Sequence, residues 1–343
     1  MCGIVGYVGK ENAASILIDG LSKLEYRGYD SAGIAVLDDS QENKEIEVIK
    51  AKGRLQALRE MTDNGRAVKG CCGIGHTRWA THGEPSVVNA HPHVSKDRKI
   101  AVVHNGIIEN YKEIKEYLQK KGYEFLSETD TEVIAHLLDY YYKGNPLEAI
   151  TKVLGRVRGS YALGILFQEN PGVMYAVRKD SPLIIGKSAQ GNFIASDVPA
   201  ILKYTKTVCY IDDREIAEIT ADSIRFYDVD QEELQKEFKT VEWDAKAAEK
   251  EGFEHFMLKE IYEQPKAVAD TISPRIKNGK IVIDELEMTD EDIKNVSRIQ
   301  MVACGSAYHV CVCAKYVLEE LAQIPVDVDL ASEFRYRNPI LEE

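Results

Sequence analysis

The sequence has 343 residues, 44% hydrophobic and 29% charged, which predicts about two globular domains and excludes a disordered or fibrous protein. Its net charge of −13 argues against broad nucleic-acid binding, which needs a basic face. No stretch approaches the ~20 apolar residues of a membrane span. The N-terminus lacks the basic region of a signal peptide. The seven cysteines form no C-x-x-C pair, so we expect reduced thiols in a cytoplasmic protein.

The first 240 residues have the periodicity of an α+β domain. Apolar runs bounded by turn residues predict strands at 4–8, 100–104, 160–167, 172–177, 182–186, 191–196 and 207–227. Helical spacing predicts helices at 12–25, 109–121, 131–142 and 146–157. Thr129 and Glu132 have the spacing of a capping box at the start of the third of these helices. Many short strands flanked by helices predict sheets packed together with helices outside.

The composition and the hydrophobic pattern of the sequence change after residue 240. Residues 241–253 are polar and of mixed charge, which predicts a linker. The elements predicted beyond it are helices at 254–272 and 289–296, a strand at 298–304, a tight loop at 305–307, a helix at 308–322 and a strand at 325–330. Strand, helix and strand in this order form one unit of a doubly wound parallel sheet. We therefore expect a complete domain over 1–240 and the incomplete beginning of an α/β domain over 254–343, since one unit cannot cover both faces of such a sheet.

Cys2 directly follows the initiator methionine. Removal of Met1, which the small second residue permits, would place a thiol and a free α-amine on one residue. The α-amine has a pKa of about 7.7–8.0, so part of it is neutral near pH 7 and can accept the thiol proton. With Met1 retained, the same site would be catalytically silent. The alternative role for Cys2 is that of a small buried thiol near the start of a strand.

A polar, turn-rich segment over 75–93 is predicted to be a loop that carries function. Arg78 has the planar fork that grips a carboxylate with two hydrogen bonds, and Thr81 and His82 add donors. The alternative for Arg78 is a surface ion pair. Five of the eight histidines fall within residues 76–104. Because neither a helical His-x-x-x-His pair nor a cysteine at ligand spacing accompanies them, we expect no metal site.

Three further residues have side chains or N–H groups that suit catalysis or substrate binding. Asn105 and Gly106 end a predicted strand, where their N–H groups suit an oxyanion hole, although Asn-Gly is also a favoured hairpin turn. Asp130 is predicted in the first turn of a helix, where it either stabilises the helix dipole or pairs with a substrate ammonium. Attack on the side-chain carbonyl of an α-amino acid needs four groups. They are a thiol nucleophile, a residue that binds the carboxylate, a partner for the ammonium and an oxyanion hole.

Several long motifs closely resemble the N-terminal-nucleophile glutamine amidotransferases. They are MCGIVG at 1–6, LEYRGYDSAG at 24–33, HTRWATHGEP at 76–85, HNG at 104–106 and SETDTE at 127–132. The resemblance implies a four-layer αββα glutaminase sandwich. KEIYEQP at 259–265 and ASEFRYR at 331–337 narrow the resemblance to the phosphosugar aminotransferases of this class, whose second domain is a sugar isomerase.

The resemblance also implies a reaction. Cys2 would attack the carboxamide of glutamine, giving a glutamyl thioester and ammonia, and water would release glutamate. Asn105 and Gly106 would stabilise the tetrahedral oxyanion, and Trp79 would gate the passage of ammonia. In the second domain the ammonia would convert fructose 6-phosphate to glucosamine 6-phosphate for hexosamine synthesis. The resemblance implies no metal or organic cofactor, and it implies a homodimer.

The same resemblance assigns the residues that bind glutamine. Arg78, Thr81 and His82 would hold the substrate carboxylate, and Asp130 would hold its ammonium. Arg27 would help to order the site. These roles agree with the chemistry that the residue types suggest by themselves.

The resemblance is weaker at the sugar-phosphate loop. Gly305, Ser306 and Ala307 match its first part, and a helix N-terminus suits a phosphate. However, Ala307 stands where serine is usual, and Val310-Cys311 replaces a common Ala-Gly pair. The chain also ends before the Ser-rich phosphate loop, the Glu, Lys and His isomerisation residues and the second repeat. We therefore expect this chain to retain at most the glutaminase half-reaction.

Two other functions remain as alternatives. One keeps the glutaminase but supplies ammonia to phosphoribosyl pyrophosphate; the lack of an acidic phosphoribosyl-binding motif and the match at 259–265 count against it. The other is a non-catalytic module that binds a sugar phosphate. Binding of sugar phosphate without turnover of glutamine would favour that module.

Overall fold

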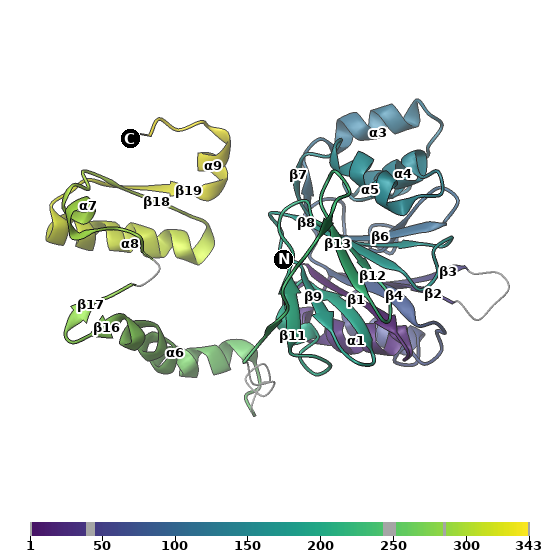
Figure 1. Ribbon diagram of the computed structural model, residues 1–343, viewed down its shortest axis with the longest axis horizontal. Helices are drawn as coiled ribbons and strands as arrows, with labels where there is room; N and C mark the ends of the chain where they lie inside the picture. The colour runs from purple at the N-terminus through teal and green to yellow at the C-terminus, as the bar shows by residue number, and fades with distance from the viewer. Residues whose placement is uncertain (1, 39–44, 243–251, 284–285, 342–343) are drawn as a thin grey trace. The chain divides into compact units, whose positions relative to one another are not determined.

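The computed structural model describes residues 2–38, 45–242, 252–283 and 286–341. The chain divides into two units, Met1–Gly252 and Phe253–Glu343 (Figure 1). The linker predicted at 241–253 lies mostly at 243–251, outside the described residues. Within the described ranges, no helix is long and apolar enough to cross a membrane. Cys2, Cys209, Cys304, Cys311 and Cys313 are free thiols.

The first unit is built on two antiparallel sheets. The eight-stranded sheet has the order β15 (Lys239–Thr240), β11 (Thr207–Tyr210), β9 (Ile184–Lys187), β10 (Gly191–Ala195), β1 (Gly3–Gly9), β4 (Cys72–Arg78), β2 (Ser31–Leu37) and β3 (Ile46–Lys52). The seven-stranded sheet has the order β14 (Glu233–Leu234), β13 (Ile224–Tyr227), β12 (Ile216–Ile219), β8 (Met174–Lys179), β7 (Gly159–Phe167), β6 (Ile100–Ile108) and β5 (His93–Val94). The strands that carry the site, β1, β4 and β6, are therefore divided between the two sheets.

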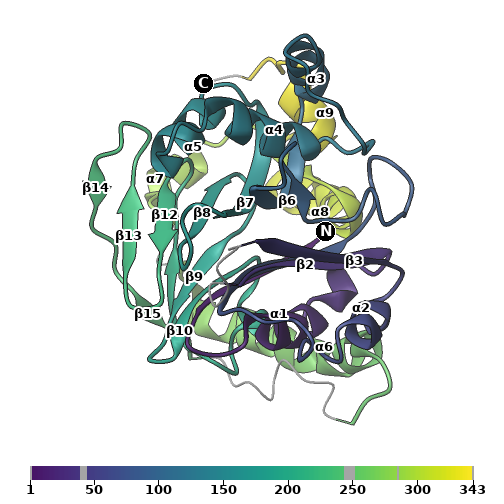
Figure 2. The same ribbon diagram turned by 90° about the vertical axis from the view of Figure 1, so that its right-hand side faces the viewer.

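Helices cover the outer face of each sheet. The first sheet is covered by α1 (Ala13–Ser22) and α2 (Leu55–Met61), and the second by α3 (Tyr111–Gln119), α4 (Glu132–Tyr141) and α5 (Pro146–Leu154). Figure 2 shows the two groups of helices on opposite sides of the paired sheets. This arrangement confirms the predicted αββα sandwich.

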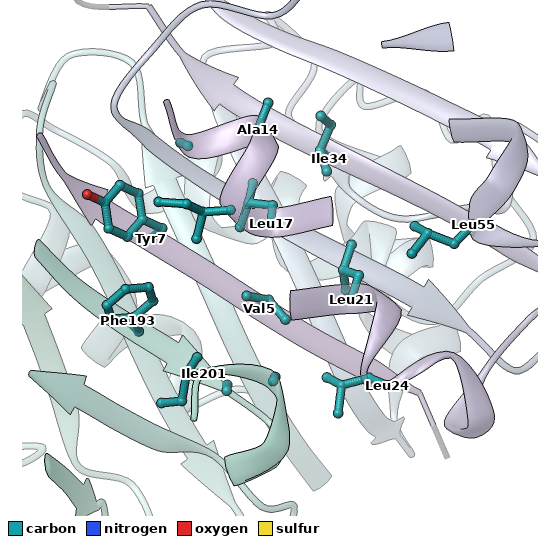
Figure 3. Packing of buried hydrophobic residues seen from close by; sticks show 14 of the residues in the cluster. Val5, Tyr7, Ala14, Leu17, Leu21, Leu24, Ile34, Leu55, Phe193 and Ile201 are labelled. Atoms are coloured by element: carbon teal, nitrogen blue, oxygen red, sulfur yellow. The ribbon is translucent and has the colours of Figure 1, made fainter. Parts of the chain in front are cut away.

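The alternation of β1 explains why a short apolar run becomes a central strand. Successive side chains of a strand point to opposite faces. Val5 and Tyr7 pack in the cluster beneath α1, against Leu17 (Figure 3). Ile4 and Val8 pack in the cluster between the sheets. Because both faces are buried, β1 fixes the residue that precedes it, Cys2, between the two sheets.

Two local predictions near the site are wrong. β6 runs on through Asn105 to Ile108, with Gly106 paired to Tyr161 of β7, so Asn-Gly forms no hairpin turn here. The segment over 75–93 is not entirely a loop either. Gly75 to Arg78 belong to β4, the loop begins at Trp79, and His93 begins β5.

The predicted capping box at 129–132 is also absent. Thr131 is the N-cap of α4 and makes no side-chain cap. The Glu132 carboxylate instead accepts from the backbone N–H groups of Leu126 and Ser127, while the Thr129 hydroxyl contacts His93 and Ser127. These tertiary partners replace the local cap.

The second unit contains the predicted strand–helix–strand order. β18 (Ile299–Ala303) and β19 (Val326–Leu330) pair in parallel, joined by α8 (Gly305–Ala322). The remaining elements are α6 (Phe256–Ile272), β16 (Ile276–Lys277), β17 (Lys280–Ile281), α7 (Asp290–Lys294) and α9 (Ala331–Tyr336). The tight loop predicted at 305–307 is wrong, because those residues form the first turn of α8.

Candidate active site

The candidate nucleophile, Cys2, is half-buried at the entry to β1. The backbone N–H of Trp79 donates to its Sγ at 3.2 Å. Burial raises the pKa of the Cys2 thiol, and the Trp79 hydrogen bond only partly offsets that rise. The resting residue is therefore a neutral thiol near pH 7, and it needs a base to become a nucleophile. Met1 lies outside the described residues.

The candidate oxyanion hole is on β6, in the other sheet. The side-chain Nδ2 of Asn105 donates to the main-chain oxygen of Cys2 at 3.1 Å. Gly106 has a φ of +127°, and a Cβ there would lie 2.1 Å from the Ser160 oxygen. Glycine is thus required at 106 both by conformation and by space.

Arg78 ends β4 and holds the loop that follows it. Its guanidinium is buried and donates to the carbonyl oxygens of His82, Gly83 at 3.0 Å and Glu84 at 3.4 Å. The Asp30 carboxylate accepts from the Ala80 N–H of the same loop. Since the fork of a guanidinium has five N–H donors, Arg78 can hold this loop and still offer donors to a carboxylate.

Asp130 is buried just before α4, not within its first turn as predicted, because Thr131 is the N-cap. One of its oxygens, Oδ2, accepts from the Ile108 N–H at 2.7 Å. That bond ties the loop before α4 to the end of β6. The carboxylate keeps a second oxygen with which to meet an ammonium group.

A cavity of about 30 Å³ lies at the centre of these groups. It is lined by Cys2, Arg78, Trp79, Thr81, His82, His91, His104, Gly106, Thr129, Asp130 and Thr131. This volume holds one or two water molecules. This volume is smaller than an amino acid.

Arg27 is not among the residues that line this cavity. It lies in the short 3-10 helix η1 (Glu25–Arg27). Its guanidinium forms a 2.9 Å ion pair with Asp197 and also contacts the Ser196 oxygen. Ser196 in turn bonds to Ile4 of β1, so Arg27 supports the strand that carries Cys2.

One side of the cavity is a buried polar wall that the sequence analysis does not predict. The Thr131 hydroxyl lies 2.8 Å from Nε2 of His91 and 2.8 Å from Nδ1 of His104. The rings of His76 and His91 stack at 4.2 Å. Burial lowers the pKa of these three histidines, so they stay neutral at physiological pH. The crowding of histidines within 76–104 was the available signal.

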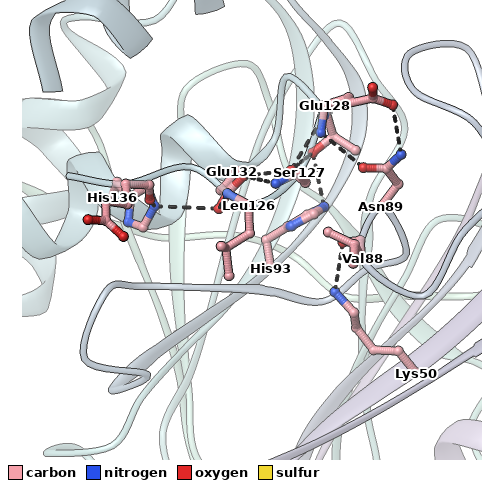
Figure 4. Close-up of polar contacts among 11 residues, drawn as sticks. Lys50, Val88, Asn89, His93, Leu126, Ser127, Glu128, Glu132 and His136 are labelled. Atoms are coloured by element: carbon pink, nitrogen blue, oxygen red, sulfur yellow. Dashed lines mark hydrogen bonds and ion pairs between the residues drawn. The ribbon is translucent and has the colours of Figure 1, made fainter. Parts of the chain in front are cut away.

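The wall continues away from the cavity (Figure 4). His93 contacts the Thr129 hydroxyl at 3.0 Å, and Thr129 contacts Ser127. The Ser127 hydroxyl donates to Glu132 at 2.6 Å. Burial acts to raise the pKa of Glu132, but donors from His136 and the 126–127 segment lower it to about 2. In the part of the chain that the structure describes, no group of three or more His, Cys, Asp or Glu is placed to hold a metal.

Comparisons with known proteins show the family to which the chain belongs. Residues 33–242 match the family model described as a glutamine amidotransferase domain, and residues 292–343 match the SIS domain. The chain belongs to the glutamine amidotransferase family. It resembles PRPP amidotransferase of B. subtilis in fold, with a TM-score of 0.61 at 20% identity over 100% of this chain and 69% of that one.

Two curated relatives carry the name glutamine–fructose-6-phosphate aminotransferase (isomerizing). The protein of Clostridium acetobutylicum is 58% identical over 99% of this chain and 55% of its own length. That of Caldanaerobacter subterraneus is 57% identical over 100% of this chain and 56% of its own length. The chain therefore spans just over half the length of these relatives.

Proposed function

We propose that this chain hydrolyses glutamine to glutamate and ammonia, with Cys2 as the nucleophile. One observation carries the proposal. The Cys2 backbone oxygen accepts from Asn105 at 3.1 Å, and the same cavity contains Cys2, Gly106 and Asp130. The candidate nucleophile, a candidate oxyanion donor and a buried carboxylate are thus close together.

The proposed mechanism begins with removal of the proton from the neutral Cys2 thiol. After removal of Met1, the α-amine of Cys2 takes the thiol proton as Sγ attacks the carboxamide carbon of glutamine. The negative charge that develops on the carboxamide oxygen is stabilised by Nδ2 of Asn105 and the N–H of Gly106. The protonated amine then gives its proton to the leaving nitrogen, which departs as ammonia. Water attacks the glutamyl thioester, and glutamate and the free thiol are released.

The remaining residues bind and enclose the substrate. Arg78, with Thr81 and His82, binds the α-carboxylate of glutamine, and Asp130 binds its α-ammonium. Trp79, which is next to Cys2 and half exposed, gates the passage of ammonia. Arg27 acts indirectly, through its contacts beside β1.

For the whole protein we propose that the ammonia converts fructose 6-phosphate to glucosamine 6-phosphate. The names of the relatives and the SIS match at 292–343 support this acceptor over phosphoribosyl pyrophosphate. Gly305, Ser306 and Ala307 lie in the exposed first turn of α8, where backbone N–H groups suit a phosphate. The free thiols are in keeping with a cytoplasmic protein, and by likeness to its family we propose a homodimer.

The test is release of glutamate from glutamine by protein whose N-terminus is shown by mass to be Cys2. Cys2→Ala should abolish release. Cys313→Ala, which removes an exposed thiol of α8, is the matched control and should keep the full rate. Unchanged release by Cys2→Ala would overturn the proposal.

A further inference from the structure

Behind the oxyanion strand, the ring of His76 faces two oxygens at once. Its Nε2 lies 3.0 Å from the main-chain oxygen of His104 and 3.0 Å from Oδ1 of Asn105. A main-chain oxygen can only accept a hydrogen bond, so Nε2 must carry the proton. The same N–H therefore also points toward the oxygen end of the Asn105 amide.

This contact matters because the two ends of an amide are nearly equal in size and opposite in hydrogen-bonding character. In the observed orientation, Nδ2 of Asn105 points to the Cys2 side. The reverse orientation would present an oxygen to the developing oxyanion and repel it. His76 bonds to Oδ1, the other end of the same amide, so this bond leaves Nδ2 available to the oxyanion.

We propose that His76 is a positioning residue for glutamine hydrolysis: its Nε2–H fixes the Asn105 amide with Nδ2 toward the reacting carbonyl. This inference rests on the proposed function, since it assigns His76 a part in that same reaction. Neither His76 nor Asn105 is among the residues that line the cavity. Asn105 reaches the Cys2 backbone through its Nδ2, and His76 acts through Asn105.

The surroundings of His76 suit this role. The residue is fully buried in β4, and its ring stacks on His91, which Thr131 holds. Burial lowers the pKa of His76 to about 3, so one nitrogen carries no proton at neutral pH. Nδ1 has no hydrogen-bond partner among the described residues, as expected for the bare nitrogen. The tautomer and the ring position are therefore both fixed.

The kinetic test is a double-mutant cycle on glutamate release. In otherwise wild-type protein, His76→Leu should lower kcat by about 10- to 100-fold, less than the loss of an oxyanion donor itself, with KM within about twofold. His76→Gln, which keeps an N–H donor, should recover part of kcat. In an Asn105→Ala background, His76→Leu should lower kcat by less than about twofold, because the amide it positions is gone. An equal loss in both backgrounds, or no loss in either, would overturn the inference.

A second measurement needs no variant. Imidazole nitrogen NMR of the wild-type protein should show His76 protonated at Nε2 and bare at Nδ1 between pH 6 and 8. The opposite tautomer would contradict the inference even if His76→Leu fails to fold. Absence of glutamate release by the wild-type protein would instead contradict the proposed function, so the two failures are distinguishable.

Discussion

The amide of Asn105 donates to the carbonyl oxygen of Cys2 at 3.1 Å, although 103 positions separate the two residues. Asn105 belongs to the seven-stranded sheet, and Cys2 enters the eight-stranded one. The candidate site is therefore formed across the interface between the sheets, and the cluster packed there, which includes Ile4 and Val103, sets the distance between Cys2 and Asn105.

Asp130→Asn should weaken glutamine binding without unfolding the protein. The asparagine oxygen can still accept from the Ile108 N–H, but its NH2 group then faces the substrate ammonium. Loss of a hydrogen bond to a charged group costs about 1.5–3 kcal/mol, so KM should rise roughly 10- to 100-fold. A glutamine analogue without the α-ammonium should react equally with both proteins. A KM that stays at the wild-type value would exclude Asp130 as the ammonium partner.

Gly106→Ala should destabilise the first unit by about 1–3 kcal/mol, because it forces a side chain into positive φ and against the Ser160 oxygen. It should also abolish glutamate release by shifting the N–H at 106. Gly122→Ala is the matched control: Gly122 has a φ of +84°, with nothing within 4 Å of an added Cβ. It should lose some stability and keep full activity. Full activity of Gly106→Ala would argue against an oxyanion role for Gly106.

Stability should fall as the pH is lowered from 7 to 5. Burial lowers the pKa of His76, His91, His93 and His104 below the ordinary 6.5, so below pH 6.5 the unfolded chain binds protons that the folded chain excludes. The stabilisation is thus complete above pH 6.5 and declines below it. Each excluded proton contributes about 1.4 kcal/mol per pH unit. Glu132, with its pKa lowered to about 2, adds pH dependence only below its ordinary 4.5.

Urea unfolding followed by circular dichroism between pH 5 and 7.5 measures this dependence. His93→Asn should reduce the slope of the free energy of unfolding against pH by an amount that corresponds to nearly one proton. His309→Asn, which changes an exposed histidine of α8, should leave the slope unchanged. A free energy of unfolding that is constant across this range would contradict the assignment of four neutral buried histidines.

The elements best predicted from the sequence are those with a simple apolar pattern. β1 and α1 are examples, because their buried faces follow strand and helix periods. β4 was missed because its glycines disfavour a strand. An added Cβ on Gly73 or Gly75 would lie 3.0 Å from the Leu17 or Leu21 side chain, so these glycines let α1 pack close to the sheet. That requirement is tertiary and leaves no local pattern.

In the candidate site, too, some features are evident from the sequence and others depend on tertiary contacts. Cys2, Asn105 and Asp130 stand out by chemical type and by resemblance to a family, and their roles stay predictions. The contact of His76 with Asn105 joins two sheets, and sequence spacing does not indicate it. The sequence predicts that Arg78 binds a carboxylate or forms a surface ion pair, whereas the structure shows that its guanidinium also donates to the 82–84 carbonyls.

The proposed mechanism depends most on a covalent bond between glutamine and Cys2. The direct test is the intact mass of protein with a free Cys2 N-terminus, quenched in acid during turnover of glutamine, with the modified residue located by peptide mapping. We predict an added glutamyl group on Cys2 that disappears once glutamine is exhausted and never forms in Cys2→Ala. Turnover of glutamine with no adduct on Cys2 at any quench time, together with undiminished turnover by Cys2→Ala, would contradict the account.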